Sequence, residues 1–273
     1  MKRGYGRGRV AAPLRQCAVC ADNDAGLHRA CAAGLARVRA CRATPNLTPL
    51  TVALSVSRLM NDRVVAAFDF DGTITTSDSF RAFMLDAAGS TRFALAALRC
   101  LPWLAGIAPG WADRGRTKAR FLYAALGPVR REALEAAAQR FVDTRLPSLL
   151  RPEMLARIRE HQALGHEVVL VSASPSVYLR KWAPSVGIGT VLASELEWRD
   201  GVYTGRLAGR NCWGPEKVAR LRAWWGERAP ATLYAYGDSR GDREMAQLAN
   251  HAWIRGESGL PPLAAAGGFG APA

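Results

Sequence analysis

Cysteine is scarce outside the first 60 residues, where four of the six cysteines of this 273-residue chain lie. The other two, Cys100 and Cys212, are far apart in sequence and predict no disulfide framework. Long apolar runs are also scarce: the stretch 50–56 is too short to span a bilayer and lacks the layout of a signal peptide. With no export signal, a reducing cytoplasm is the expected compartment.

Acidic residues are scarce at the start of the chain. Residues 1–60 hold ten Lys and Arg against two Asp, whereas the remaining residues hold 27 Lys and Arg against 21 Asp and Glu. Much of the net charge of +14 therefore belongs to the first 60 residues. The rest of the chain is only moderately basic, which suits an anionic substrate, and we expect no nucleic acid at the core.

The first 60 residues form a basic, cysteine-containing extension without a sustained helical or strand period. A second closely spaced cysteine pair is missing, which disfavours zinc and favours a disordered or weakly helical segment. The residues concerned are Cys17, Cys20, His28, Cys31 and Cys41. Because Met60 stands just before the first predicted strand, we also expect the native protein to start there, with residues 1–59 a mis-assigned start. An N-terminal peptide upstream of Met60 would contradict this.

Two carboxylates follow the first predicted strand. Residues 64–68 are β-branched or apolar, which is typical of a strand buried on both faces, and Asp69 and Asp71 come next. Side chains alternate in extended backbone, so the two acids start on the same side, and Gly72 allows an immediate turn. An acidic Asp-Gly turn without chemistry is the alternative. Ligands of parallel α/β sheets bind at the carboxyl ends of the strands, which favours a site.

Residues 78–146 are rich in Ala and Leu and predict about four helices, separated by turn signals near residues 89, 109 and 127. They form an all-helical insertion between the first strand and the next α/β unit. Within it, residues 93–109 are strongly apolar, broken by Arg99 and Pro102. We expect a buried helix of a small bundle, with an exposed apolar surface that meets a lipid substrate as the alternative.

The alternating pattern then resumes. The sequence predicts helices over 152–163 and 215–225, and strands over 166–171, 188–192, 231–236 and 251–254, with a hairpin that turns at Asp200-Gly201. Ser172 stands at the end of one strand, Lys217 in the first turn of a helix, and Asp238 and Asp242 after the strand over 231–236. A Ser-Pro helix cap and a solvated lysine are the alternatives for the first two. The tail over 259–273 is expected to be loose.

In this order, an Asp-x-Asp-Gly-Thr strand, a strand ending in Ser, a helical Lys and a Gly-Asp-x-x-x-Asp segment resemble the haloacid dehalogenase (HAD) superfamily over residues 64–255. The helical insertion is similar to that of the subgroup containing phosphoserine phosphatase. The resemblance implies an α/β fold, a Rossmann-like core of parallel strands flanked by helices. The core would comprise residues 61–77 and 147–258, and a C1-type helical cap residues 78–146.

The resemblance also implies a Mg²⁺-dependent phosphatase. Mg²⁺ prefers hard oxygen ligands, and Asp69, the Asp71 backbone carbonyl, Asp238 and Asp242 would supply them or hold a coordinated water. As in the family, Asp69 would attack phosphorus and form an aspartyl-phosphate, with Asp71 as general acid and base. Thr73 would help to position Asp71.

Other residues would bind the substrate. Ser172, the Ala173 N–H and Lys217 would hold the phosphoryl oxygens. By weaker resemblance, Asp78 would correspond to the acid that reads the amine of phosphoserine, and Arg120 to the arginine that binds its carboxylate.

The motifs depart from the phosphoserine phosphatase pattern at two positions. The last motif carries Gly241 where Asn usually stands, and Trp213 takes the place of the usual lysine, with Lys217 one helical turn later. The Gly-Pro-Glu-Lys pattern is similar to the branch that includes phosphatidylglycerophosphatase-type enzymes. A small phosphorylated metabolite and a lipid phosphate both stay open as substrates, as does peripheral membrane contact through the cap. A HAD-fold protein that binds a phosphorylated ligand or a partner without turnover is the alternative function.

Overall fold

The computed structural model describes residues 63–263. The predictions for the extension 1–60, including the zinc alternative at Cys17 and Cys20 and the start at Met60, lie outside these residues. So do the last ten residues of the predicted tail.

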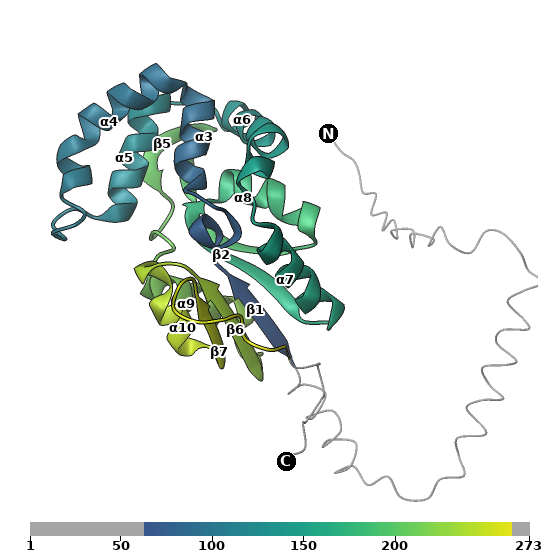
Figure 1. Ribbon diagram of the computed structural model, residues 1–273. Coiled ribbons are helices and arrows are strands. Elements are labelled where there is room, and N and C mark those ends of the chain that lie inside the picture. Colours follow the sequence, from purple (N-terminus) through teal and green to yellow (C-terminus); the bar gives the residue numbers. More distant parts are fainter. Residues whose placement is uncertain (1–62, 264–273) are drawn as a thin grey trace, which may run out of the picture. The chain divides into compact units, whose positions relative to one another are not determined.

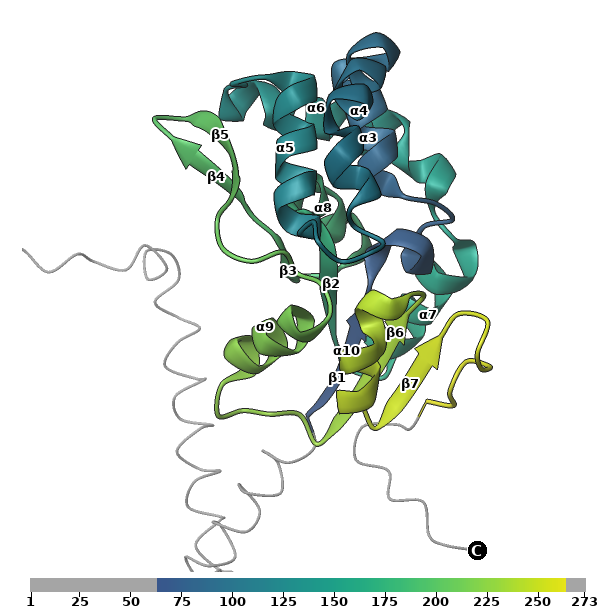
Figure 2. The ribbon, with the colours of Figure 1, turned by 90° about the vertical axis from the view of Figure 1, so that its left-hand side faces the viewer.

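A five-stranded parallel sheet forms the centre of the described chain (Figures 1 and 2). Its order is β3-β2-β1-β6-β7. The strands are β1 (Val64–Phe68), β2 (Glu167–Pro175), β3 (Thr190–Ser194), β6 (Thr232–Gly237) and β7 (His251–Ile254). The predicted α/β fold with a parallel sheet is confirmed, and β2 runs four residues beyond its predicted end. Since β1 lies between β2 and β6, a crevice opens where the strand order reverses.

Helices cover both faces of this sheet because alternate strand residues point to opposite sides. Phe68 and Leu170 belong to one apolar cluster, together with residues of α7 (Pro152–Ala163) and α8 (Ser176–Trp182). Val65 and Ala67 belong to the other, with α9 (Pro215–Trp225) and α10 (Arg243–Leu248). Short 3-10 turns lie at Leu146–Leu149, Ala183–Val186 and Arg240–Asp242. Burial on both faces explains the continuous apolar strands.

Four helices lie between β1 and β2: α3 (Ser79–Ala88), α4 (Ser90–Ala105), α5 (Arg114–Leu126) and α6 (Arg131–Thr144). The segments that lead to and from them pair with each other, since Thr75 forms an antiparallel bridge with Leu150 and Thr76 N donates to Leu149 O at 2.7 Å. The chain therefore leaves and re-enters the sheet at one place. How it divides into core and cap domains stays a prediction.

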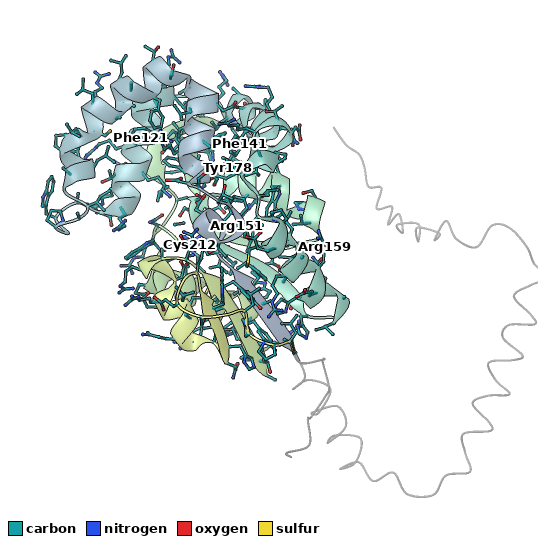
Figure 3. All side chains as sticks on the ribbon, in the orientation of Figure 1. Phe121, Phe141, Arg151, Arg159, Tyr178 and Cys212 are labelled. Atoms are coloured by element: carbon teal, nitrogen blue, oxygen red, sulfur yellow. The ribbon has the colours of Figure 1, made fainter. Side chains whose placement is uncertain are left out.

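Aromatic side chains join these helices to the sheet layer. Phe83 of α3 and Phe141 of α6 pack against Tyr178 of α8, with ring centroids 5.0 and 5.5 Å from the tyrosine. Figure 3 shows Phe141 and Tyr178 inside the molecule, with Phe121 among the helices. The Tyr178 hydroxyl also lies 2.9 Å from Ser79 Oγ. Edge-on aromatic pairs stabilise beyond their buried area, so this contact fixes α3 and α6 on α8.

The predicted hairpin forms as β4 (Leu196–Arg199) and β5 (Val202–Leu207). Asp200 and Gly201 turn with φ of 51° and 75°, which Asp tolerates and Gly favours. The hairpin packs on α5, where the Tyr203 hydroxyl donates to Ala119 O at 3.1 Å. It therefore lies beside the helices rather than in the parallel sheet (Figure 2).

The apolar stretch 93–109 is only partly buried. Ala96 and Cys100 of α4 belong to the core, whereas Leu95, Leu98 and Leu101 are exposed. The expected buried helix is therefore wrong for one side of α4, and the exposed-surface alternative describes that side. Among the described residues, the helices are too short or too polar to cross a membrane.

A chain of hydrogen bonds lies under the sheet. His161 of α7 is fully buried. Its Nε2 is hydrogen-bonded to the Tyr236 hydroxyl at 2.8 Å, and its Nδ1 is hydrogen-bonded to His166 Nδ1 at 2.8 Å. Arg157 Nε donates to the same hydroxyl at 2.9 Å. Burial lowers the pKa of His161 to about 3, and the charges of His166 and Arg157 act in the same direction. His161 is therefore neutral in the folded protein.

This makes stability depend on pH. The unfolded chain takes up a proton on His161 below about pH 6.5 and the folded protein only near pH 3, so the contribution of His161 is complete above pH 6.5 and is lost as the pH falls. Each pH unit in that window should cost about 1.4 kcal/mol of unfolding free energy at this site. We expect His161→Gln to flatten the decline measured by urea unfolding at pH 7 and pH 5. His251→Gln is the control, and equal slopes in all three proteins would contradict the assignment.

Candidate active site

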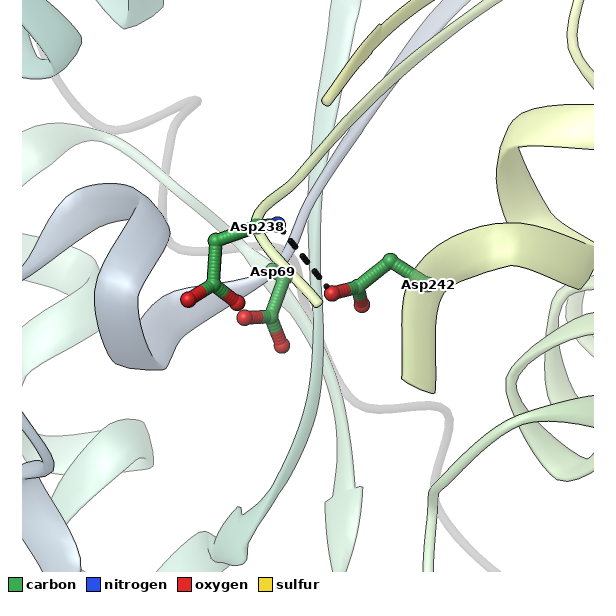
Figure 4. A group of neighbouring side chains, drawn as sticks. All are labelled: Asp69, Asp238 and Asp242. Atoms are coloured by element: carbon green, nitrogen blue, oxygen red, sulfur yellow. Dashed lines mark hydrogen bonds between the residues drawn. The ribbon is translucent and has the colours of Figure 1, made fainter. Parts of the chain in front are cut away.

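Three carboxylates converge at the carboxyl edge of the sheet. Asp69 directly follows β1, and Asp238 and Asp242 follow its neighbour β6 (Figure 4). One oxygen of each lies within 4.8 Å of the others. The parallel register that pairs Phe68 with Tyr236 brings both strand ends to the same level. The structure thus brings together three acids that stand up to 173 positions apart in sequence.

Lys217 is inserted among these acids. Lys217 is 1% exposed, and its ammonium donates to Asp242 Oδ1 at 2.6 Å and also contacts Asp69 Oδ1. The other oxygen of Asp242 accepts from Ser239 Oγ at 3.0 Å and from the Asp238 N–H at 3.2 Å. Asp242 is therefore held from both sides. Among the described side chains, Lys217 is the hydrogen-bond partner of Asp69, through Oδ1, which leaves Oδ2 available for another ligand.

The acids carry more negative charge than Lys217 balances. Burial raises the pKa of Asp69 to about 8, although the attraction of Lys217 acts in the opposite direction. Burial also raises the pKa of Asp238, and the Asp242 carboxylate adds to that shift. Burial opposes the charge of Lys217, yet Asp69 and Asp242 keep the pKa of this ammonium above its usual range. A further cation would restore the charged form of Asp69.

The site has the donor set that such a cation needs. Hard divalent ions such as Mg²⁺ bind carboxylate oxygens and keep several waters, and three carboxylates within reach of one another fit this requirement. Gly72, at φ 76°, leaves the space for one of them, because a Cβ there would overlap the Asp238 carboxylate. These residues fit a magnesium ion.

Asp71 lies in a different environment from Asp69. The Ser79 N–H donates to Asp71 Oδ1 at 2.7 Å, and the Ser174 hydroxyl contacts Oδ2. Burial raises the pKa of Asp71, and the nearby Asp78 carboxylate adds to it. Thr73 was predicted to position Asp71, but its hydroxyl is buried without a hydrogen-bond partner among the described residues. Ser79 and Ser174 orient Asp71 instead.

The end of β2 contributes the predicted Ser172 and Ala173. Ser172 is buried, and its Oγ accepts from the Ser174 N–H at 3.1 Å. The Ala173 carbonyl accepts from Lys118 Nζ of α5 at 2.9 Å. Lys118 was not among the predicted site residues. Its local signal is a run of basic residues at alternate positions, and that run gives no indication of which one points toward the sheet.

Charge couples Lys118 to the acids. Burial lowers the pKa of Lys118, while Asp71, Asp78 and Asp69 act to raise it. The ammonium also lies 5.0 Å from the centroid of the Phe80 ring. A lysine from the helical layer therefore reaches the same edge of the sheet as the carboxylates.

The two weaker substrate-binding predictions have different placements. Asp78 caps α3 by accepting from the Arg81 N–H at 3.0 Å, and it stays close enough to shift the pKa of Asp71. Arg120 is exposed, and its guanidinium stacks over Trp103 at 4.1 Å. The structure thus brings Lys118, rather than Arg120, to the carboxylates.

A cavity of about 1410 Å³ lies against α5 and α9, the helices that carry Lys118 and Lys217. It lies between α5, the segment after β5 and the start of α9, and its lining includes none of the four acids. Its walls are basic, with five arginines against Asp113 and Glu216. The arginines are Arg114, Arg116, Arg120, Arg206 and Arg210. The net positive charge of these walls suits an anionic molecule.

The two departures from the phosphoserine phosphatase pattern contact each other. A Cβ on Gly241 would overlap the Trp213 indole, and the Gly214 N–H donates to Gly241 O at 3.0 Å. The Trp213 ring in turn lies 4.9 Å from the Arg114 guanidinium of α5. The tryptophan therefore requires the glycine, and it connects α9 with the helical layer.

Comparison with known proteins identifies the family. A model of the haloacid dehalogenase-like hydrolase family matches residues 66–247, which is more than half of the chain. The chain belongs to this family. It is also 36% identical over 214 residues to the protein CicA of Caulobacter vibrioides, a match that covers 76% of this chain and 95% of the relative.

Solved structures share the fold. A Bordetella pertussis protein of unknown function is 26% identical, with a TM-score of 0.61, and the match covers 70% of this chain and 88% of that one. Phosphoserine phosphatase, solved as a phospho-aspartyl intermediate analogue, is 18% identical, with a TM-score of 0.51 over 70% of this chain and 85% of that one. The second likeness shows a common HAD fold.

The carboxylate cluster predicts that Mg²⁺ stabilises the protein. At about a hundredfold excess of free Mg²⁺ over its Kd, the expected gain is about 2.7 kcal/mol, measured as a rise in the thermal unfolding midpoint. Asp238→Asn should remove most of this rise. Asp200→Asn makes the same chemical change at the hairpin turn, where Asn tolerates positive φ, and should leave it intact. A rise of equal size in both variants would place the ion elsewhere.

Proposed function

We propose that this HAD-family hydrolase is a phosphatase that cleaves phosphate monoesters through an aspartyl-phosphate on Asp69. The observation that supports it best is the pair of acids in two environments at one strand end. Asp69 contacts the buried Lys217 ammonium, while Asp71 accepts hydrogen bonds from Ser79 and Ser174. Acids whose surroundings differ in this way suit different roles in one reaction.

In the first step, an Asp69 oxygen attacks phosphorus and the ester P–O bond breaks. The leaving alkoxide takes a proton from Asp71, so that alcohol leaves and an aspartyl-phosphate remains. Burial raises the pKa of Asp71, which favours the protonated form that this step requires. Lys217 holds Asp69 in place and offsets the negative charge that gathers on the phosphoryl oxygens.

In the second step, Asp71, now ionised, accepts a proton from a water that attacks the same phosphorus. The P–O bond to Asp69 breaks, phosphate leaves, and both acids return to their first state. Ser172 and the backbone at Ala173 lie at the end of β2, beside these acids, and we assign them to the phosphoryl oxygens. Thr73 receives no role in this scheme.

Magnesium fits the proposal. Asp69, Asp238 and the Asp71 carbonyl would hold it, and Asp242 would hold a coordinated water. Bound Mg²⁺ would neutralise the phosphate and the Asp69 carboxylate, whose mutual repulsion otherwise opposes attack.

For the substrate, we propose an anionic monoester that enters along the basic cavity. A lipid phosphate, as in the phosphatidylglycerophosphatase-type branch, and a small metabolite such as phosphoserine are the two candidates. The exposed position of Arg120 on Trp103 lends no support to a carboxylate-binding arginine. In this proposal the helices α3–α6 act as the cap, and Lys118 is the cap residue that reaches the substrate.

Replacing the nucleophile tests the mechanism. Asp69→Asn should lower phosphate release from p-nitrophenyl phosphate with Mg²⁺ by at least about a thousandfold, because an amide does not form the covalent intermediate. Asp86→Asn, an exposed position on α3, is the matched control and should keep full activity. Turnover that survives Asp69→Asn would defeat the mechanism. A wild-type protein that binds phosphate without any turnover would favour the binding-only alternative.

Replacing the cap lysine tests the role of α5. Lys118→Met should reduce kcat/KM about tenfold or more, and it should shift the acid–base profile upward, because a cation that lowers the pKa of Asp71 is lost. Lys118→Arg should restore part of the activity. Arg120→Met removes a cation from the same helix, away from the acids, and should have a small effect. Equal losses of kcat/KM in the variants at positions 118 and 120 would indicate that the positive charge of the cap attracts the anionic substrate in general, without a specific role for Lys118.

A further inference from the structure

The side of α4 that points away from the other helices is apolar. Leu95, Leu98 and Leu101 are 57%, 69% and 56% exposed, and their spacing of three residues places them along one side of the helix. Leu104 and Trp111 extend this surface, which we call the outer α4 face. Residues 95–111 contain six of the eight large apolar side chains that are exposed in the described part of the chain. Single exposed leucines are ordinary, but a group of this size marks an interaction surface.

Packing within the protein does not account for this face. The opposite side of α4 already supplies the contacts with the other helices, through the buried Ala96 and Cys100 and through Phe93, whose ring lies 5.1 Å from that of Phe121. Figure 1 shows α4 at the outer edge of the helical layer, with α5 between it and the hairpin. The helix is thus apolar on two sides, and one of them has no partner among the described residues.

Basic residues border the outer α4 face, and the nearest acids in sequence, Asp86 and Asp113, stand just outside residues 87–112. Residues 87–112 contain Arg92 and Arg99, both exposed, and no Asp or Glu. At 100° per residue, these two arginines lie next to each other on one flank of the leucine row. Exposed Arg114 and Arg116 follow at the start of α5. Apolar side chains bordered by arginines, with tryptophan at the edge, are typical of helices that lie in a membrane interface.

We propose that the outer α4 face docks this protein onto the surface of a bilayer that contains anionic phospholipid. The leucines enter the boundary between headgroups and acyl chains, and the arginines contact the lipid phosphates. The helix lies in the interface and does not cross it.

Charge favours an anionic bilayer over two other occupants of the outer α4 face, a second copy of the protein and residues 1–60 of the same chain. A second copy would bring the same arginine-bordered face against itself, so that like charges would meet. Residues 1–60 carry ten Lys and Arg against two Asp, so they too would add positive charge to a positive border. An anionic lipid surface is complementary to both the apolar row and its basic flank.

Docking in this way also relates to the cavity. Trp111, which belongs to the outer α4 face, and Ile107 follow α4 and line the basic cavity. The surface that meets the membrane is thus continuous with the wall of the cavity that we propose as the entry path for an anionic substrate. The docking itself does not rest on the proposed phosphatase activity and is tested without it.

The test is co-sedimentation of the full chain with vesicles of phosphatidylcholine alone or mixed with phosphatidylglycerol. The wild type should bind the mixed vesicles. Leu98→Gln combined with Leu101→Gln should lower the partition coefficient at least about tenfold, because the bilayer no longer buries two leucine side chains. Arg92→Gln with Arg99→Gln should weaken binding to mixed vesicles only, and added salt should have the same effect. Leu260→Gln removes an exposed leucine elsewhere and should leave binding unchanged.

Each outcome decides the proposal. All variants should hydrolyse soluble p-nitrophenyl phosphate like the wild type, so a failure of docking and a failure of the phosphatase proposal are distinguishable. If the leucine double variant binds as tightly as the wild type, the basic start of the chain or another surface carries the binding and the proposal is overturned. Absence of wild-type binding overturns it as well. Self-association that the same double variant abolishes would identify a second copy as the occupant and reject the membrane.

Discussion

The buried ammonium of Lys217 is the contact on which the arrangement of the site depends. It joins the end of β1, through Asp69, to the segment after β6, through Asp242, and it comes from a third element, α9. Burying one charge without its partners is costly, so these three groups stabilise one another only as a set. Because Asp242 is also held by Ser239 and by the Asp238 N–H, the set leaves Asp69 and Asp238 as the acids with oxygens still available.

The second part of the site comes from the helical layer. Ser79 at the start of α3 and Lys118 on α5 contact Asp71 and the Ala173 carbonyl respectively, so the groups around the second acid belong to two regions of the chain. Tyr178, packed against Phe83 and Phe141, keeps α3 on α8 and thereby sets where Ser79 lies. The aromatic contacts of the fold therefore determine the surroundings of a catalytic candidate.

The sequence pattern predicted those features of the fold that depend on neighbouring residues in the chain. The strands, the four inserted helices and the hairpin follow from apolar periodicity and turn residues, and the acids could be placed at one sheet edge because parallel strands end at the same level. The contact of Lys118 with Ala173 depends on how α5 rotates against the sheet, which a run of alternating basic residues does not encode. For the same reason the sequence does not indicate that the Arg120 guanidinium lies over Trp103. The orienting groups of Asp71 likewise needed the tertiary structure, since Thr73 stands closer in sequence than Ser174.

The contact between Trp213 and Gly241 has a consequence for descent within the family. The indole fills the space that any larger side chain at position 241 would need, so an asparagine there is compatible only with a smaller residue at position 213. An asparagine at position 241 is strained while Trp213 is present, whereas replacing Trp213 first opens the space, so a stepwise exchange between the two patterns has one favoured order. We therefore expect the two positions to covary among relatives, and the pair to separate lineages that share the same acids and lysine.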